Sequence, residues 1–230
     1  MAGRWGCAPM ARMQRVTRVE RPDWPADDPI ECAALNSAAL SLVLDNPSIR
    51  VVLIVAARRL LEDEGYAVRM GDAPVPDGAF EGLTNLVDEL QRARKEVVFL
   101  VDNPTVGESS DCVPRRTGFA ALDELLTRLR DATCNIPYDS YASAIAPYLR
   151  RVAALKATHP ALMVFDPTPL LCDMPDNRCP MLRDGNFLYS YFDHVSNYGG
   201  DLVVAGLRPV IESLSPSNAV ADQPASDRTR

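Results

Sequence analysis

His194 is the side chain of this sequence best suited to acid–base chemistry. It is one of two histidines, and it stands in an Asp-His-Val-Ser run that follows the strand-like segment 187–189 and precedes a turn-like Asn-Tyr-Gly-Gly run. An imidazole takes and returns a proton near neutral pH, and a histidine just after a strand end lies where side chains converge on an α/β active site. The plainer interpretation of a lone histidine is a cap on a loop or a helix start. The residues around His194 therefore have to decide between a catalytic and a capping role.

The elements that must position such residues alternate between strands and helices. Continuous aliphatic runs predict strands at 50–57, 96–101 and 162–165, as is typical of strands buried on both faces of a parallel sheet. Apolar residues at helical spacing predict four helices, at 83–94, 119–129, 141–155 and 201–214. We therefore expect an α/β fold, a three-layer sandwich with a mostly parallel sheet between helices. The Pro- and Gly-rich segment 71–82 is predicted to be a loop. Residues 1–214 form one domain in this interpretation, and 215–230 form a disordered tail.

Polar residues follow each of the three predicted strands. In an open α/β sheet, ligands bind beyond the carboxyl ends of the strands, where Arg58, Asp102-Asn103 and Asp166 are expected. Arg58 is the candidate for binding an anionic group or an oxyanion, and a salt bridge or a solvated arginine is an equal alternative. The two carboxylates are interpreted as helix caps or loop residues, and Ser196 as the cap of a helix that begins near Asn197.

The segment 188–199, LYSYFDHVSNYG, resembles the last conserved block of SGNH domains, which have the GDSL-type esterase fold. It is most similar to the domains at the periplasmic end of acyltransferase-3 (AT3) family O-acetyltransferases, which acetylate lipopolysaccharide O-antigen and similar envelope glycans. In that family the block reads Leu-Tyr-x-Asp-x-x-His-Leu-Ser-x-x-Gly. Five residues of this chain fall in register with it, and Val195 replaces the second leucine: Leu188, Tyr189, His194, Ser196 and Gly199.

Weaker similarities extend the resemblance upstream. The segment 51–58 is similar to the family block in which an aliphatic strand ends in Ala and Arg, and 99–104 is similar to the central strand and its Pro-containing loop. Asp166-Pro167 followed by Cys172 resembles the strand-then-cysteine segment. Cys7-Ala8-Pro9 resembles the Cys-Pro-Pro run that lies beyond the nucleophile helix. The resemblance therefore spans Cys7 to Leu214.

The chain departs from the family pattern at the nucleophile. In these domains a Gly-Asp-Ser-His run comes after the first strand, and no Gly-Asp-Ser occurs here; the nearest string, Gly71-Asp72-Ala73, lacks the hydroxyl. Because Cys7-Ala8-Pro9 already resembles a run downstream of that block, we expect an N-terminally truncated SGNH domain without its first strand. That strand would lie between the strands at 50–57 and 96–101 or beside them, and its absence would leave an apolar edge open to pairing.

A second departure concerns the catalytic acid. Three residues before the histidine, where the family has Asp, this chain has Tyr191. The nearest carboxylate is Asp193, next to His194. Neighbouring residues of an extended chain point to opposite faces, so Asp193 can replace the family residue only in a tight turn.

The resemblance implies an O-acyltransferase or esterase domain that acts on a cell-surface glycan. Its serine takes an acyl group and passes it to a sugar hydroxyl, with His194 as base and then acid and Asp193 as the candidate orienting carboxylate. Without that serine the chain alone is expected to be inactive. The alternative is a non-catalytic glycan-binding or interaction module with a degenerate SGNH fold. An unrelated flavodoxin-like domain is disfavoured, because no Gly-rich phosphate loop follows any strand.

The implied partners are the AT3 membrane domain, in the same or a neighbouring polypeptide, and a cell-surface polysaccharide. No cofactor is implied, and the expected location is the periplasmic face of the inner membrane. A net charge of −7 argues against a nucleic-acid partner, since that affinity rests largely on phosphate neutralisation. The longest apolar run, 51–57, is far shorter than the about 20 residues that span a bilayer, and the basic segment 1–19 lacks the apolar core of a secretory signal.

The six cysteines allow many pairings. No CxxC motif occurs, and His159, interpreted as a surface loop residue, is the only histidine besides His194, so no metal site is predicted. Sequential pairing agrees with the placement of cysteines in the resembled family and predicts three disulfides: Cys7–Cys32, Cys112–Cys134 and Cys172–Cys179. Disulfides imply an oxidising compartment such as the periplasm, whereas reduced cysteines would be ordinary buried thiols.

Overall fold

The central element of the fold is a three-stranded parallel sheet. The computed structural model describes residues 7–17, 31–62, 66–71, 73–76, 78–104, 117–191 and 194–214. Strands β2 (Val51–Val55), β5 (Glu96–Leu100) and β7 (Met163–Phe165) lie in the order β2-β5-β7, and both pairs are parallel. The three aliphatic runs therefore form the predicted strands, in the parallel arrangement that their continuous apolar character indicates.

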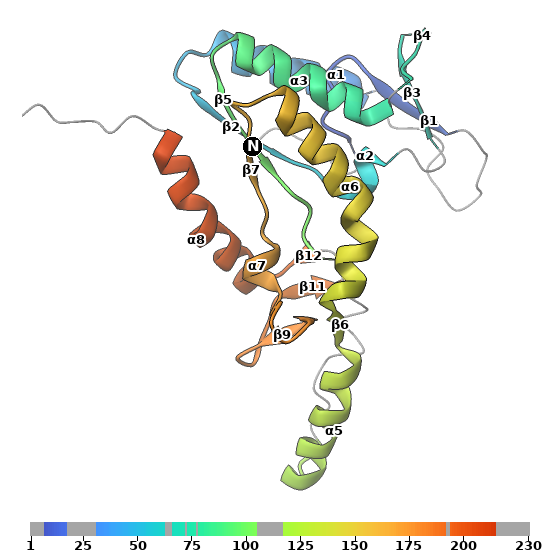
Figure 1. The fold of residues 1–230 in the computed structure, drawn as a ribbon, viewed down its shortest axis with the longest axis vertical. Helices are drawn as coiled ribbons and strands as arrows, with labels where there is room; N and C mark the ends of the chain where they lie inside the picture. Colours follow the sequence, from blue (N-terminus) through green and yellow to red (C-terminus); the bar gives the residue numbers. More distant parts are fainter. Residues whose placement is uncertain are drawn as a thin grey trace, which may run out of the picture.

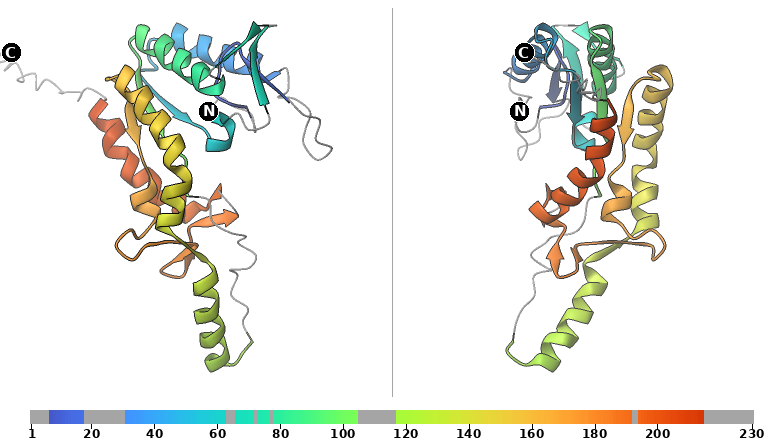
Figure 2. Two further views of the ribbon diagram at one scale, coloured as in Figure 1. Left: turned by 45° about the vertical axis from the view of Figure 1, so that its right-hand side comes forward. Right: turned by 90° about the vertical axis from the view of Figure 1, so that its left-hand side faces the viewer.

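Helices cover both faces of this sheet. Helices α3 (Gly78–Arg92) and α6 (Tyr138–Thr158) lie on one side, and α1 (Glu31–Asp45) and α8 (Asn197–Leu214) lie on the other (Figures 1 and 2). The larger apolar cluster joins β2 and β5 to α3 and α6, where the ring of Phe80 packs edge-on against Tyr148. The predicted α/β sandwich with helical layers on both faces is confirmed.

Several boundaries differ from the predictions. The expected loop at 71–82 contains the short strand β4 (Ala73–Pro74) and the first turns of α3. Strand β4 belongs to a small antiparallel sheet with β1 (Gln14–Thr17) and β3 (Tyr66–Met70), which the sequence analysis missed. Helix α5 (Ala120–Thr133) lies close to its predicted range, and Figure 1 shows it extending away from the sheet.

The chain between β7 and α8 forms a group of short elements. It contains the one-turn helix α7 (Thr168–Leu171) and two short hairpins, β9 (Leu182–Arg183) with β10 (Asn186–Phe187) and β11 (Tyr189–Tyr191) with β12 (His194–Val195). Its remaining strand, β8 (Arg178–Pro180), pairs with β6 (Asn135–Pro137), which precedes α6. A second apolar cluster, centred on the fully buried Leu171, Leu188 and Tyr189, anchors this group to α8. The group carries His194.

Two of the predicted disulfides are present in the structure. Cys7 is joined to Cys32 at the start of α1, and Cys172 is joined to Cys179 across the turn between α7 and β8. Cys134 is also disulfide-bonded, and its predicted partner Cys112 lies outside the described residues. The first bond ties the N-terminal end of the described chain to α1, and the second closes a turn among the short elements between β7 and α8.

His159 is not the surface loop residue that the sequence suggested. Its side chain is only 7% exposed and stands at the C-terminal end of α6. Nδ1 lies 2.9 Å from the carbonyl oxygen of Leu155 and 2.9 Å from the hydroxyl oxygen of Thr158. Nε2 lies 3.0 Å from Oδ1 of Asp88 on α3. This histidine therefore joins two helices of one layer and has a structural role.

Candidate functional site

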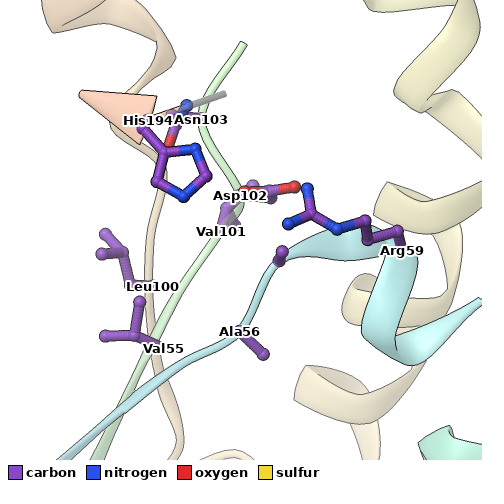
Figure 3. A pocket seen from close by; sticks show the side chains of 9 residues that line it. Val55, Ala56, Arg59, Leu100, Val101, Asp102, Asn103 and His194 are labelled. Carbon is purple, nitrogen blue, oxygen red and sulfur yellow. The ribbon is translucent and has the colours of Figure 1, made fainter. Parts of the chain in front are cut away.

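His194 lies at the carboxyl ends of β2 and β5, where the chemistry of an open α/β sheet is expected. A cavity of about 190 Å³ opens there (Figure 3). It is lined by the strand ends, the residues that follow them and the imidazole: Val55, Ala56, Ala57, Arg59, Leu100, Val101, Asp102, Asn103 and His194. We call this cavity the His194 pocket.

The β11–β12 hairpin holds His194 against the sheet. Tyr189 pairs with Val195 and Tyr191 with His194, and the hydroxyl of Ser190 donates to the carbonyl oxygen of His194 at 3.1 Å. Tyr189 is fully buried beneath the hairpin. The imidazole thus projects from a short, anchored strand of its own and reaches the ends of β2 and β5 from outside the parallel sheet.

The corner after His194 explains the spacing of serine and glycine in the recognised block. The Oγ atom of Ser196 accepts the N–H of Gly199 at 3.1 Å and donates to the carbonyl oxygen of Phe187. Helix α8 therefore begins at Asn197, so the predicted cap is confirmed and the Asn-Tyr-Gly-Gly run is the first turn of a helix. The same corner places α8 directly against the backbone of Leu188.

Asp102 connects the pocket to the following helix. Its Oδ2 accepts the backbone N–H of Arg58 at 2.7 Å, at the start of the one-turn helix α2 (Arg58–Leu61). Asp166 likewise accepts the N–H of Thr168 at 2.9 Å, at the start of α7. Both carboxylates are caps, as expected. Burial raises the pKa of Asp102 above 3.8, and the Arg58 N–H and the charge of Arg59 oppose that shift. Figure 3 shows the guanidinium of Arg59 beside this carboxyl group.

The raised pKa of Asp102 predicts a pH dependence of stability. Between the unfolded value of 3.8 and the higher native value, the native state binds more protons than the unfolded state. The contribution of this group to the free energy of unfolding therefore falls as pH rises through that window. Asp102→Asn keeps an acceptor for the Arg58 N–H and removes the charge. We expect it to be at least as stable as wild type at neutral pH and to match wild type in strong acid, as measured by urea unfolding. A wild-type advantage that grows with pH would contradict this.

Arg58, the predicted candidate for binding an anion, does not line the His194 pocket, and it forms the salt bridge that was the alternative. The guanidinium of Arg58 donates to the carbonyl oxygen of Ala144 at 2.9 Å and lies 3.4 Å from Glu62. It lines an adjoining cavity of about 270 Å³ against α6, which shares Asp102 and Asn103 with the His194 pocket. Arg59 lines the His194 pocket itself. The order of two adjacent arginines on a single helical turn has no signature in the sequence.

Asn103 is a pocket residue that the sequence placed at this edge of the sheet without giving it a chemical role. Its side-chain amide lies in the His194 pocket and donates to the carbonyl oxygen of Pro104 at 3.2 Å. An amide N–H is the kind of donor that stabilises an oxyanion. Its position directly after a buried strand, in an Asp-Asn-Pro run, was the available signal.

The remaining residues of the predicted site are Asp193 and Tyr191. Asp193 lies outside the described residues, so its role as the orienting carboxylate stays a prediction. Tyr191, which stands at the family's Asp position, is the direct strand partner of His194. None of the described residues that line the His194 pocket carries a hydroxyl or a thiol.

No helix within the described segments is long and apolar enough to cross a membrane. Among solved structures, the chain is similar to the periplasmic domain of the lipopolysaccharide acetyltransferase of Salmonella ser. Paratyphi A, with 13% identity and a TM-score of 0.44. That similarity covers 89% of this chain and 68% of the other. No curated protein matches the chain. The family model described as "SGNH domain (fused to AT3 domains)" matches residues 2–209, nearly the whole sequence. The chain therefore belongs to the family of SGNH domains that are fused to AT3 domains.

Proposed function

We propose that this domain serves in an envelope O-acyltransferase, where it passes an acyl group, such as acetyl, to a hydroxyl of a cell-surface glycan. The observation that carries the proposal is the position of His194, whose imidazole lines a pocket at the carboxyl ends of the parallel strands with an amide and a guanidinium. Membership of a family fused to AT3 domains supports acyl transfer as the reaction.

The pocket side chains fit the steps of acyl transfer. His194 takes the proton of the attacking hydroxyl as its oxygen bonds to the acyl carbon, and later returns the proton to the departing oxygen. The carbonyl oxygen becomes negative in the transition state, and the Asn103 amide and the Arg59 guanidinium supply N–H donors for it. Asp193 would orient the imidazole. The nucleophilic hydroxyl of the proposed reaction is not among the described residues that line the pocket.

The AT3 domain is the proposed acyl supplier, in the same or a neighbouring polypeptide. The disulfides support an oxidising compartment, and we place the domain at the periplasmic face of the inner membrane. A second function, a non-catalytic glycan-binding module, is favoured by one observation: the described lining of the His194 pocket includes no hydroxyl or thiol.

The effect of replacing His194 on glycan acetylation distinguishes acyl transfer from non-catalytic glycan binding. In membranes that contain the AT3 domain and this chain, we expect His194→Gln to lower O-acetylation of the surface polysaccharide about 10²-fold or more, as mass spectrometry of the glycan would measure. The matched control is His159→Gln, because His159 lies in the α3–α6 layer and outside the pocket. Equal acetylation by both variants, with glycan binding retained, would favour the binding module.

A further inference from the structure

A second cavity opens beside the His194 pocket, and its lining includes neither His194 nor Arg59. This cavity of about 270 Å³ lies between α2, the end of β5, β6 and the start of α6, and we call it the Arg58 cavity. Asp102 and Asn103 line both cavities, so the two cavities meet at the carboxyl end of β5. A group held in the Arg58 cavity therefore lies next to the place where acyl transfer is proposed.

Contacts between neighbouring elements fix the walls of the Arg58 cavity. Nη1 of Arg58 donates to the carbonyl oxygen of Ala144 at 2.9 Å, which joins α2 to α6. The hydroxyl oxygen of Tyr141 lies 3.2 Å from Oγ1 of Thr168, which joins α6 to α7. Because Asp102 also holds the start of α2, the cavity is formed before any ligand enters, as is usual for binding sites of small molecules.

The lining combines apolar surface with a few polar groups. Ile145 is only 3% exposed, and the ring of Tyr141 is half-buried, whereas Ser140 is exposed at the mouth of the cavity. A sugar ring has the same mixed character, since its C–H groups make apolar faces and its hydroxyls make a polar rim. The volume lies just below the about 300–1,000 Å³ of pockets for drug-sized ligands, so the cavity fits one ring-sized group.

The charges around the Arg58 cavity are balanced. The guanidinium of Arg58 lies 3.4 Å from Glu62, and the guanidinium of Arg59 stands beside Asp102 (Figure 3). Each cation therefore already has a carboxyl group next to it. A carboxylate on the ligand, such as that of a uronic acid, would lose its hydration without gaining an unpaired cation, which is unfavourable. The cavity thus favours an uncharged sugar.

We propose that the Arg58 cavity is the acceptor subsite, which holds one uncharged sugar residue of the surface polysaccharide and directs a hydroxyl of that sugar past Asn103 toward His194. The subsite rests on the proposed function, because without acyl transfer a sugar held here would be bound for recognition alone. The Ser140 hydroxyl and the Tyr141 ring, both in the first turn of α6, are the groups that would select the sugar.

The test follows the δ1 methyl groups of the isoleucines by NMR in the full chain. Ile136 and Ile145 line the Arg58 cavity, whereas Ile54 and Ile211 do not. The probe is the surface polysaccharide of the cells that produce this protein, purified and stripped of its acetyl groups. It should shift the signals of Ile136 and Ile145 saturably and leave those of Ile54 and Ile211 unchanged. Neutral monosaccharides released from that polysaccharide should compete, and glucuronate at the same concentration should not.

Two exposed serines of α6 supply a matched pair of variants. Ser140→Phe fills the mouth of the cavity and should weaken binding about tenfold or more. Ser143 lies outside the cavity lining, so Ser143→Phe should bind as wild type does. In membranes with the AT3 domain, Ser140→Phe should raise the polysaccharide concentration for half-maximal acetylation by a similar factor at an unchanged maximal rate, because His194 stays in place. The methyl spectrum of each variant reports whether it is folded.

The outcomes separate the acceptor subsite from the enzymatic function. Saturable shifts at Ile136 and Ile145, with equal acetylation by His194→Gln and His159→Gln, would support sugar binding in the Arg58 cavity and contradict acyl transfer. Shifts confined to other methyl groups, or no shift at the highest soluble concentration, would overturn the subsite and leave the acetylation experiment to judge the function. Competition by hexanoate in place of sugars would assign the cavity to an acyl chain, and competition by glucuronate would assign it to an acidic sugar. Either result would overturn the proposal.

Discussion

Replacement of Gly199 by alanine is expected to lower the free energy of unfolding by about 3 kcal/mol, at the upper end of the usual cost of overpacking. A Cβ atom built on Gly199 would lie 2.2 Å from the carbonyl oxygen of Leu188 and 3.1 Å from its carbonyl carbon. Both are backbone atoms, so no rotation of a side chain can relieve the overlap, and α8 would have to move away from the hairpin. For a domain of this size the melting temperature should fall by about 5–10 °C.

The neighbouring glycine supplies the control. A Cβ atom on Gly200 would meet nothing within 4 Å, and Gly200 also lies in the first turns of α8. Because alanine favours a helix over glycine by about 1 kcal/mol, Gly200→Ala should be neutral or slightly stabilising. Opposite signs at adjacent positions, measured by thermal unfolding, would establish that the glycine of the recognised block is required by the close approach of α8 to Leu188. Equal effects would contradict that explanation.

The sequence was most informative where local pattern and packing agree. The three parallel strands are continuous aliphatic runs, and α3, α6 and α8 carry apolar stripes, so each could be recognised without knowledge of its neighbours. Helix α1 was missed because its own small and apolar residues lie on most of its faces. No distinct apolar stripe at helical spacing therefore marks it in the sequence. The β1–β3 pairing was missed because it joins Gln14 to Arg69, which no local pattern indicates.

The candidate site shows the same limit. His194 was identified through the spacing of its block, and Ser196 through the capping chemistry of serine before a helix. Arg59 was not identified and Asn103 was given no role, because their part in the pocket depends on how α2 and the end of β5 meet. The bond between Arg58 and Asp102, which are 44 residues apart, decides which arginine faces the pocket. Such a contact forms only when the sheet is assembled, whereas a helix cap or a strand can be predicted from residues that are adjacent in the sequence.

Removal of a disulfide is expected to have an effect as large as that of Gly199→Ala. The Cys7–Cys32 bond spans 25 residues and the Cys172–Cys179 bond spans seven. Loop closure in the unfolded chain predicts a loss of about 3 kcal/mol for the double replacement Cys7→Ala and Cys32→Ala, and about 2 kcal/mol for Cys172→Ala and Cys179→Ala. Urea unfolding should also show a steeper denaturant dependence in each variant, because the unfolded chain is less constrained and exposes more surface.

Treatment with a reductant distinguishes the loss of the disulfide cross-link from the loss of side-chain packing that replacing the cysteines could cause. Wild-type protein should lose stability when it is reduced, and each double-alanine variant should lose less, because one of its bonds is already absent. Non-reducing peptide mapping of protein taken from an oxidising compartment should recover Cys7–Cys32 and Cys172–Cys179, and it tests the predicted third pair, Cys112–Cys134. Free thiols at these positions would contradict the disulfides of the structure and remove the chemical support for a periplasmic location, since the bonds persist only where the surroundings are oxidising.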